Sequence, residues 1–283
     1  MSILQFKNYN VSLKDSNKYI ITDLSFIINE GESLGIVGES GSGKSLTALS
    51  MLGLLDKKIF SYNGEIIIND KNILKINNDE LCSLRGNYVS MIFQEPMLSL
   101  NPVKNLASQI YECTNLSKKN LDITDIKNTL NAVGLSSNDK MLSSYPHMLS
   151  GGQRQRFMIA MSIIREPKII VADEPTTALD VTLQKRILDL LINLKNNLNM
   201  SMVLISHDIK LIKKYCDQII VMKDGRIVEN QTANNIFITP KHEYTKKLVN
   251  FESTSFRDDY ILRNEPVLET KNLTRSKKYI SKC

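Results

Sequence analysis

The feature that most constrains the fold of this 283-residue chain is a glycine-rich segment, Gly38-Glu39-Ser40-Gly41-Ser42-Gly43-Lys44-Ser45. It follows the apolar run Ser33–Val37 and opens a helical pattern, so it forms the turn between a buried strand and a helix. In such a turn backbone N–H groups close around phosphate oxygens, and the start of the helix favours negative charge. A nucleoside triphosphate is therefore expected, with Lys44 reaching its β- and γ-phosphates and Ser45 holding Mg²⁺.

Short apolar runs rich in β-branched residues alternate with helical patterns along the chain. This alternation predicts an α/β domain with a mostly parallel sheet, and together with the glycine-rich segment it indicates a P-loop NTPase core. The N-terminal runs are joined by turns such as Asn29-Glu30-Gly31, which predicts an antiparallel β subdomain there. The predicted parallel strands are Ser33–Val37, Val89–Phe93, Lys168–Asp173, Met202–Ser206 and Gln218–Met222, and the antiparallel ones are Ile3–Tyr9, Leu24–Ile28 and Gly64–Ile68.

One domain is expected over residues 1–250, with a helical subdomain inserted at about 101–150, where the sequence is polar and has no strand run. Residues 251–283 are expected to form a C-terminal extension. Within it Val267–Leu273 loosely repeats Ile3–Tyr9, and a β-like extension is favoured over the start of a second, shortened domain.

Composition narrows the class of protein. With 42% hydrophobic and 23% charged residues the chain matches soluble globular proteins, and no apolar run approaches the ~18 residues that span a bilayer. The N-terminus does not read as a signal peptide, so any membrane channel is expected to be another chain. The four scattered cysteines argue against a zinc site or a disulfide framework and fit a reducing cytoplasm.

The net charge of +6 is modest and spread along the chain, and positive residues are obviously concentrated only in the tail. A solvated tail, or one near anionic lipid, is favoured over a nucleic-acid partner, and no nucleic acid is expected to bind.

A second apolar run ends in two acids, Ile169-Ile170-Val171-Ala172-Asp173-Glu174. A strand with this ending is usually just a strand that meets solvent. Downstream of a phosphate-binding loop, however, Asp173 is expected to hold the Mg²⁺ shell and Glu174 to polarise an attacking water.

The segment Leu149-Ser150-Gly151-Gly152-Gln153 makes the pattern specific, because it stands at the start of a predicted helix, Arg154–Arg165. An ordinary serine cap would explain Ser150 but not the residues that follow it. Free amides at this helix start form a second anion-binding surface, separate from the first.

With these motifs in this order, the chain resembles the ATP-binding subunits of ABC transporters over about residues 3–250. The resemblance implies that two ATP molecules, each with Mg²⁺, are buried between two such subunits. In that family the Leu-Ser-Gly-Gly-Gln segment of one subunit closes over the ATP on its partner, a role that would fall to Ser150, Gly151, Gly152 and Gln153.

Further residues take roles only from this resemblance. Gln94 would sense Mg²⁺ and the membrane subunits, Asp180 would communicate across the dimer, and His207 would contact the γ-phosphate. Tyr19 is the candidate for stacking on adenine. The implied reaction is in-line attack of water on the γ-phosphate, catalysed by positioning and charge neutralisation, with Glu174 orienting or deprotonating the water.

Several short strings resemble those of the family's importers of oligopeptides, dipeptides and nickel: Arg85-Gly86, Phe93-Gln94-Glu95-Pro96-Met97, Ser99-Leu100-Asn101-Pro102, Tyr145-Pro146-His147-Met148 and His242-Glu243-Tyr244-Thr245. The implied partners are two membrane permease subunits, a second and non-identical motor subunit, and, indirectly, an extracytoplasmic substrate-binding protein. The implied location is the cytoplasmic face of the cell membrane. Peptide is the leading cargo, and nickel or another metal complex is the alternative.

Longer members of this branch carry a cysteine-rich extension that holds an iron–sulfur cluster. Cys283 stands alone in the tail here, so no cluster is expected. A soluble ABC ATPase of translation or DNA repair is less favoured, because the chain has neither two complete motor domains nor a long coiled-coil insertion.

Overall fold

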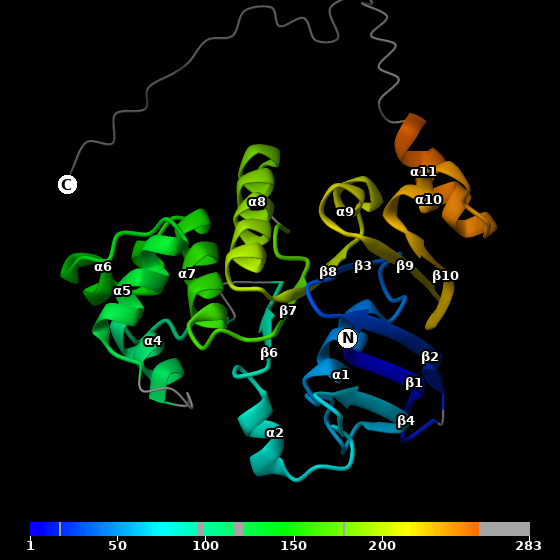
Figure 1. The fold of residues 1–283 in the computed structure, drawn as a ribbon, viewed down its shortest axis with the longest axis horizontal. Coiled ribbons are helices and arrows are strands. Elements are labelled where there is room, and N and C mark those ends of the chain that lie inside the picture. The colour runs from blue at the N-terminus through cyan, green and yellow to red at the C-terminus, as the bar shows by residue number, and fades with distance from the viewer. Residues whose placement is uncertain (17, 95–98, 116–120, 178, 255–283) are drawn as a thin grey trace, which may run out of the picture.

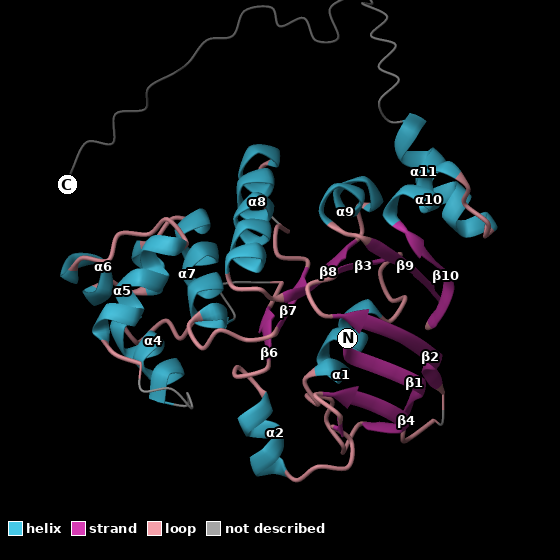
Figure 2. Cartoon of the chain, in the orientation of Figure 1, coloured by secondary structure: helices cyan, strands magenta, loops and turns pink. Residues whose placement is uncertain are grey.

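The computed structural model describes residues 1–16, 18–94, 99–115, 121–177 and 179–254, which form two sheets with helices around them (Figures 1 and 2). The strands are β1 (Ser2–Leu13), β2 (Tyr19–Asn29), β3 (Ser33–Val37), β4 (Phe60–Ile68), β5 (Lys71–Asn72), β6 (Val89–Ile92), β7 (Ile169–Asp173), β8 (Ser201–Ser206), β9 (Gln218–Lys223) and β10 (Arg226–Thr232). The α-helices are α1 (Lys44–Met51), α2 (Asn78–Leu84), α4 (Leu106–Asn115), α5 (Ile123–Ala132), α6 (Asp139–Ser143), α7 (Gly151–Ile163), α8 (Val181–Asn197), α9 (Ile209–Tyr215), α10 (Ala233–Ile238) and α11 (Glu243–Thr254).

The larger sheet has the strand order β10-β9-β3-β8-β7-β6. Strands β9, β3, β8, β7 and β6 pair in parallel, and only β10 is antiparallel to its neighbour. The α/β fold class is confirmed, and each predicted parallel strand is present with ends that agree to within one residue. Strand β10 was not predicted, because its sequence has few apolar residues and it lies at the sheet edge.

The central strands are buried along their whole length, because apolar layers cover both faces of the larger sheet. In β7, Ile170 and Ala172 join one apolar cluster, whereas Ile169 and Val171 join the other. Side chains of a strand point alternately to its two faces, so a continuous apolar run is what a strand covered on both faces requires. The sheet is thereby a rigid support for the loops that leave its strands.

The smaller sheet is antiparallel, with the order β2-β1-β4-β5, and it lies beside the larger one at the lower right of Figure 1. It contains the three predicted N-terminal strands. Its apolar face packs in the same cluster as α1 and one face of the larger sheet, through residues such as Phe6, Ile28 and Ile66. The two sheets therefore enclose one of the two cores.

Helices α4, α5, α6 and α7 gather on the left of Figure 1, away from the smaller sheet. The described residues of the range 101–150 contain α4, α5, α6 and the short 3₁₀ helix Pro146–Met148, and no strand. Helix α11 continues to Thr254, past the boundary expected at residue 250. Val267–Leu273 and Cys283 lie outside the described residues. Within the described ranges, no helix combines the length and the apolar character needed to cross a membrane.

The turn between β9 and β10 joins the two sheets at Gly225. Its φ is +75°, its N–H donates to the Ser42 carbonyl (3.2 Å), and its carbonyl accepts from the Thr22 N–H (2.9 Å). A Cβ atom added here would lie 1.9 Å from the Ile20 carbonyl oxygen. Gly225 is thus a position where a side chain has no room.

We expect Gly225→Ala to lower the free energy of unfolding by about 2–4 kcal/mol, because it adds a backbone clash to the cost of a left-handed alanine. Urea unfolding measures this. The control is Gly31→Ala, since Gly31 has a φ of +74° but open space around its added Cβ. Equal losses in both variants would contradict the proposed close approach.

Candidate active site

The glycine-rich loop leaves β3 at Val37 and enters α1 at Lys44. Gly41 and Gly43 have φ angles of +80° and +100°, which favour glycine, and Gly43 is the residue that caps α1. At Gly38 an added Cβ would lie 2.2 Å from the Met222 carbonyl oxygen. The loop is therefore a turn built from backbone, with free helix amides at its end.

Lys44 is the first residue of α1 and is only 6% exposed. Its ammonium group donates to the carbonyl oxygens of Gly38 (2.7 Å) and Glu39 (2.8 Å), so it lies inside the loop. Burial lowers the pKa of Lys44, and the nearby carboxylates of Glu174 and Asp173 oppose that shift. A buried cation within a ring of amides is suited to bind a phosphate.

Asp173 ends β7 and is 5% exposed. Burial raises its pKa, and a hydrogen bond from Ser45 opposes the rise. One carboxylate oxygen of Asp173 and the hydroxyl of Ser42 are buried without a hydrogen-bond partner among the described residues. Such unpaired buried atoms are costly unless a ligand satisfies them.

Ser45, Gln94 and Asp173, the three predicted metal residues, line one hollow of about 460 Å³. Hydroxyl, amide and carboxylate oxygens are the ligands that Mg²⁺ prefers. Since one oxygen of Asp173 is also unpaired, this set of donors fits Mg²⁺ bound together with a phosphate.

Glu174 lies directly after β7, with a φ of +44°, in the left-handed region. Its N–H donates to the Ile205 carbonyl of β8 (3.0 Å), which holds the backbone there. Strained backbone of this kind is typical of functional residues and costs roughly 1–3 kcal/mol. No sequence signal predicts this conformation, because Glu174 is neither Gly nor Asn.

Three predicted residues meet at the Glu174 carboxylate. Its Oε2 accepts from Gln94 Nε2 (3.3 Å) and from Thr177 Oγ1 (2.9 Å), and its Oε1 lies 3.5 Å from His207 Nδ1. Gln94, Glu174 and His207 follow β6, β7 and β8, which are neighbours in the sheet. The carboxyl ends of parallel strands thus bring these side chains together. Thr177 was not predicted, and its only signal is its position three residues after Glu174.

The segment Ser150–Gln153 lies apart from the hollow that contains Ser45 and Asp173. Ser150 caps α7 by accepting from the Gln153 N–H (3.3 Å), and Gln153 accepts in return from the Ser150 N–H (2.9 Å). Ser150, Gly151, Gly152, Gln153 and Asp180 line a hollow of about 610 Å³. That hollow shares no lining residue with the one that contains Ser45 and Asp173. Within one chain, the two predicted phosphate-binding surfaces are therefore separate.

Tyr19 begins β2 and is 59% exposed. Two residues later, the Ile21 side chain approaches Gly43, where an added Cβ would lie 3.3 Å from it. The start of β2 therefore lies beside the glycine-rich loop. The stacking of Tyr19 on adenine stays a prediction.

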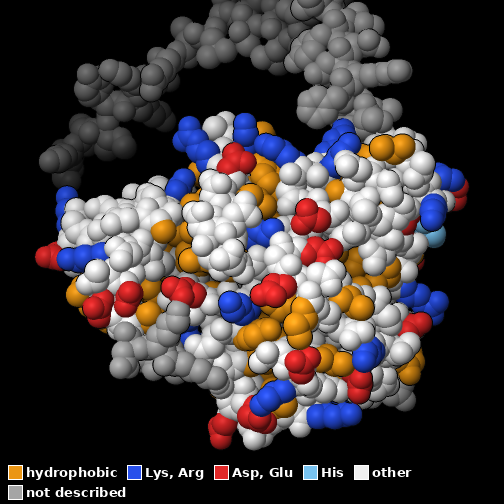
Figure 3. Space-filling view, in the orientation of Figure 1, with side chains coloured by type: hydrophobic (Ala, Val, Ile, Leu, Met, Phe, Trp, Pro, Cys, Tyr) orange, Lys and Arg blue, Asp and Glu red, His pale blue; other side chains and the backbone are white. Residues whose placement is uncertain are grey.

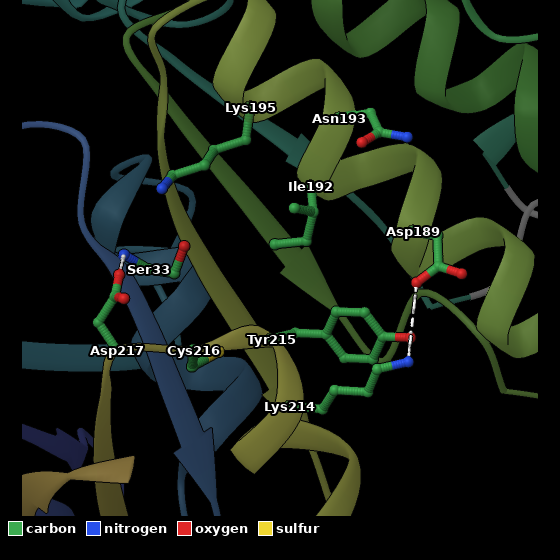
Figure 4. A pocket seen from close by; sticks show the side chains of 9 residues that line it. All are labelled: Ser33, Asp189, Ile192, Asn193, Lys195, Lys214, Tyr215, Cys216 and Asp217. Carbon is green, nitrogen blue, oxygen red and sulfur yellow. Dashed lines mark hydrogen bonds and ion pairs between the residues drawn. The ribbon is translucent and has the colours of Figure 1, made fainter. Parts of the chain in front are cut away.

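Positive and negative side chains are interspersed over most of the face shown in Figure 3, and neither sign forms a continuous field there. A hollow between α8 and α9 is lined by Asp189, Lys195, Lys214 and Tyr215, among others (Figure 4). None of the predicted site residues lines it, so it is not part of the site described above.

Comparisons with known proteins agree on one family. The family model described as "ABC transporter" matches residues 21–177. The uncharacterized ABC transporter ATP-binding protein YejF of Escherichia coli is 43% identical over 89% of this chain and 49% of its own length. The oligopeptide transport ATP-binding protein AppD of Bacillus subtilis is 44% identical over 81% of this chain and 71% of its own length. The chain spans about half the length of the YejF relative.

Among solved structures, the dimeric ATP-binding cassette MJ0796, in a post-hydrolysis state bound to ADP and Pi, matches with a TM-score of 0.70 and 26% identity. The match covers 81% of this chain and 98% of that one.

Proposed function

The chain belongs to the ABC transporter family of ATP-binding proteins, and on that premise we propose that it is the ATP-hydrolysing motor subunit of a peptide importer. The observation that carries the proposal is the separation of two anion-binding surfaces on one chain, at Lys44 and at Ser150. Each is half of a site, and a second motor subunit supplies the other half. The peptide cargo is supported by relatives named for oligopeptide transport.

The proposed chemistry rests on this chain's own residues. The glycine-rich loop and Lys44 bind and orient the triphosphate, and Glu174 accepts a proton from the attacking water at its carboxylate. Gln94 and Thr177 hold that carboxylate in place through hydrogen bonds to Oε2. Ser45, Gln94 and Asp173 would hold Mg²⁺, which would supply positive charge to neutralise the phosphates. His207 lies beside the other carboxylate oxygen, Oε1, and Ser150 to Gln153 close over the partner's nucleotide.

The proposed assembly has two membrane permease subunits and a second, non-identical motor subunit at the cytoplasmic face of the membrane, with a substrate-binding protein on the other side. Gln94 belongs to the surface that meets the permease. Phe93, the last residue before Gln94, is exposed, which suits a protein contact.

The proposed closing of Ser150 to Gln153 over a partner's ATP can be tested at Gly151. An added Cβ at Gly151 meets nothing within 4 Å, so both Gly151→Asp and Gly151→Ala should fold. The aspartate places a carboxylate where a phosphate would approach. In cells whose own copy is deleted, we expect uptake of a labelled oligopeptide to fall to background with Gly151→Asp and to persist with Gly151→Ala.

ATP binding by each purified variant, measured with a fluorescent ATP analogue, should equal that of the native chain, since Lys44 is untouched. Uptake of a labelled free amino acid should not change. Oligopeptide uptake that survives Gly151→Asp, or that does not depend on this chain at all, would overturn the proposed role.

A further inference from the structure

Tyr244 connects the C-terminal helix to the glycine-rich loop. It is the second residue of α11, it is 6% exposed, and its hydroxyl oxygen accepts a hydrogen bond from the Glu39 N–H at 2.9 Å. Burial raises the pKa of Tyr244, so its phenol stays protonated at neutral pH. The two residues are 205 positions apart in the chain. A helix outside the nucleotide-binding motifs thus contacts the loop directly.

The start of α11 is itself held in place by Glu229 of β10. The amides of Lys241 and His242 each donate to its carboxylate at 2.9 Å. Burial of Glu229 opposes its ionisation, but these amide hydrogen bonds lower its pKa overall, so it stays charged at neutral pH. His242 Nδ1 then accepts from the Tyr244 N–H (3.1 Å). Charge-assisted bonds of this kind are stronger than neutral ones.

The ring of Tyr244 is also fixed by packing. It belongs to the apolar cluster on one face of the larger sheet, and Leu248 and Val249 of α11 pack against the same cluster. The ammonium group of Lys223, at the end of β9, lies 5.2 Å from the ring centroid. The hydroxyl is therefore presented to Glu39 by a side chain that has little freedom to turn.

Both backbone polar groups of Glu39 are hydrogen-bonded in this structure. Its N–H donates to Tyr244, and its carbonyl accepts from the Lys44 ammonium group at 2.8 Å. When a phosphate attracts Lys44, the Glu39 carbonyl loses the hydrogen bond from that lysine. The hydrogen bond from the Glu39 N–H to Tyr244 does not involve the lysine and can remain. The hydrogen bond to Tyr244 can thus hold this end of the loop both with and without a bound phosphate.

We propose that Tyr244, anchored through Glu229, is a positioning residue that keeps the glycine-rich loop in the shape that binds ATP; this inference rests on the proposed ATPase activity. Without the hydroxyl, the Glu39 N–H loses its partner and the loop samples other shapes. ATP must then order the loop as it binds, which weakens binding. Once ATP is bound, the hydrolysing groups at Glu174 are unchanged.

The direct test is Tyr244→Phe, which keeps the ring and removes the oxygen. We expect the KM for ATP and the Kd of a fluorescent ATP analogue to rise about three- to tenfold, with kcat within about twofold of the native value. The matched control is Tyr215→Phe. Tyr215 also bonds through its hydroxyl, to Asp189 at 2.9 Å, but it lies in the hollow between α8 and α9 (Figure 4).

Hydrogen exchange gives a second measurement, independent of activity. Amides of residues 38–42 should exchange faster in Tyr244→Phe than in the native chain, and not in Tyr215→Phe. Glu229→Gln should raise the KM for ATP, as Tyr244→Phe does. Combined with Tyr244→Phe it should add less than about twofold, because both changes act through the same contact.

The proposal is overturned if Tyr244→Phe leaves KM, Kd and loop exchange unchanged, if it lowers kcat alone, or if the effects of Glu229→Gln and Tyr244→Phe multiply. These outcomes are distinct from failure of the proposed ATPase, because in that case the native chain itself would not hydrolyse ATP.

Discussion

Replacing Glu174 with glutamine is expected to slow ATP hydrolysis by about 10²–10⁴-fold while leaving ATP affinity close to that of the native chain. Glutamine has nearly the same shape, and its carbonyl oxygen can still accept from Gln94 or Thr177, the two donors to Oε2. Its amide nitrogen can face His207, so the arrangement of side chains should persist. What is lost is the group that takes a proton from the attacking water.

Phosphate release from saturating ATP measures the rate, and a fluorescent ATP analogue measures affinity. The control is Glu166→Gln. Glu166 stands before β7 and Glu174 after it, and both are non-glycine residues with left-handed φ angles, of +50° and +44°. The control should hydrolyse ATP at the native rate. A Glu174→Gln variant that stays within tenfold of that rate would show that another group activates the water.

The Glu174→Gln variant should also accumulate with ATP in the closed, two-subunit form, since opening follows hydrolysis. Mass in solution with ATP and Mg²⁺ measures this, with the second motor subunit added. A closed form that appears equally in the native chain at steady state would contradict the link between hydrolysis and opening.

Replacing Lys44 with methionine is expected to weaken ATP binding by about 10²-fold or more. Methionine keeps most of the aliphatic stem but removes a buried positive charge that would pair with phosphate. Hydrolysis should fall at least in proportion. Binding titrations measure the affinity, and Lys195→Met is the control because Lys195 lines the separate hollow in Figure 4.

The pH dependence of ATP binding has a definite sign. Burial lowers the pKa of Lys44, so as the pH rises above neutral this lysine loses its proton before ordinary lysines do. ATP binds the protonated form better, so the affinity of the native chain should fall as the pH rises through that lowered pKa. Lys44→Met should lack this fall. An unchanged pH profile in the variant would assign the titration to another group.

Much of the fold could be predicted because its signals are local. The strands β3, β7 and β8 are continuous apolar runs, and a buried parallel strand needs that pattern. The sequence after β9 predicted fewer of the elements that the structure contains. Strand β10 reads as polar because only part of it is buried, and helices α10 and α11, which follow it, were not predicted.

The site was predictable to the extent that it is made of contiguous motifs. The glycine-rich loop and the acids of β7 are each local, and the order of strands explains why they meet. The contact between Tyr244 and Glu39 depends on how α11 packs, which no local pattern encodes. The left-handed backbone of Glu174 was equally hidden, because it is imposed by a hydrogen bond to the neighbouring strand.

The strand order has a consequence for how the protein is made. Strand β3 pairs with β8 and β9, which are encoded more than 160 residues later. A ribosome that has released only residues 1–177 has released the glycine-rich loop without either neighbour of the strand that carries it. The antiparallel sheet β2-β1-β4-β5 can form early, from residues 2–72. The nucleotide site therefore cannot be completed until β8 and β9 have been synthesised, and ATP can assist folding only after that point.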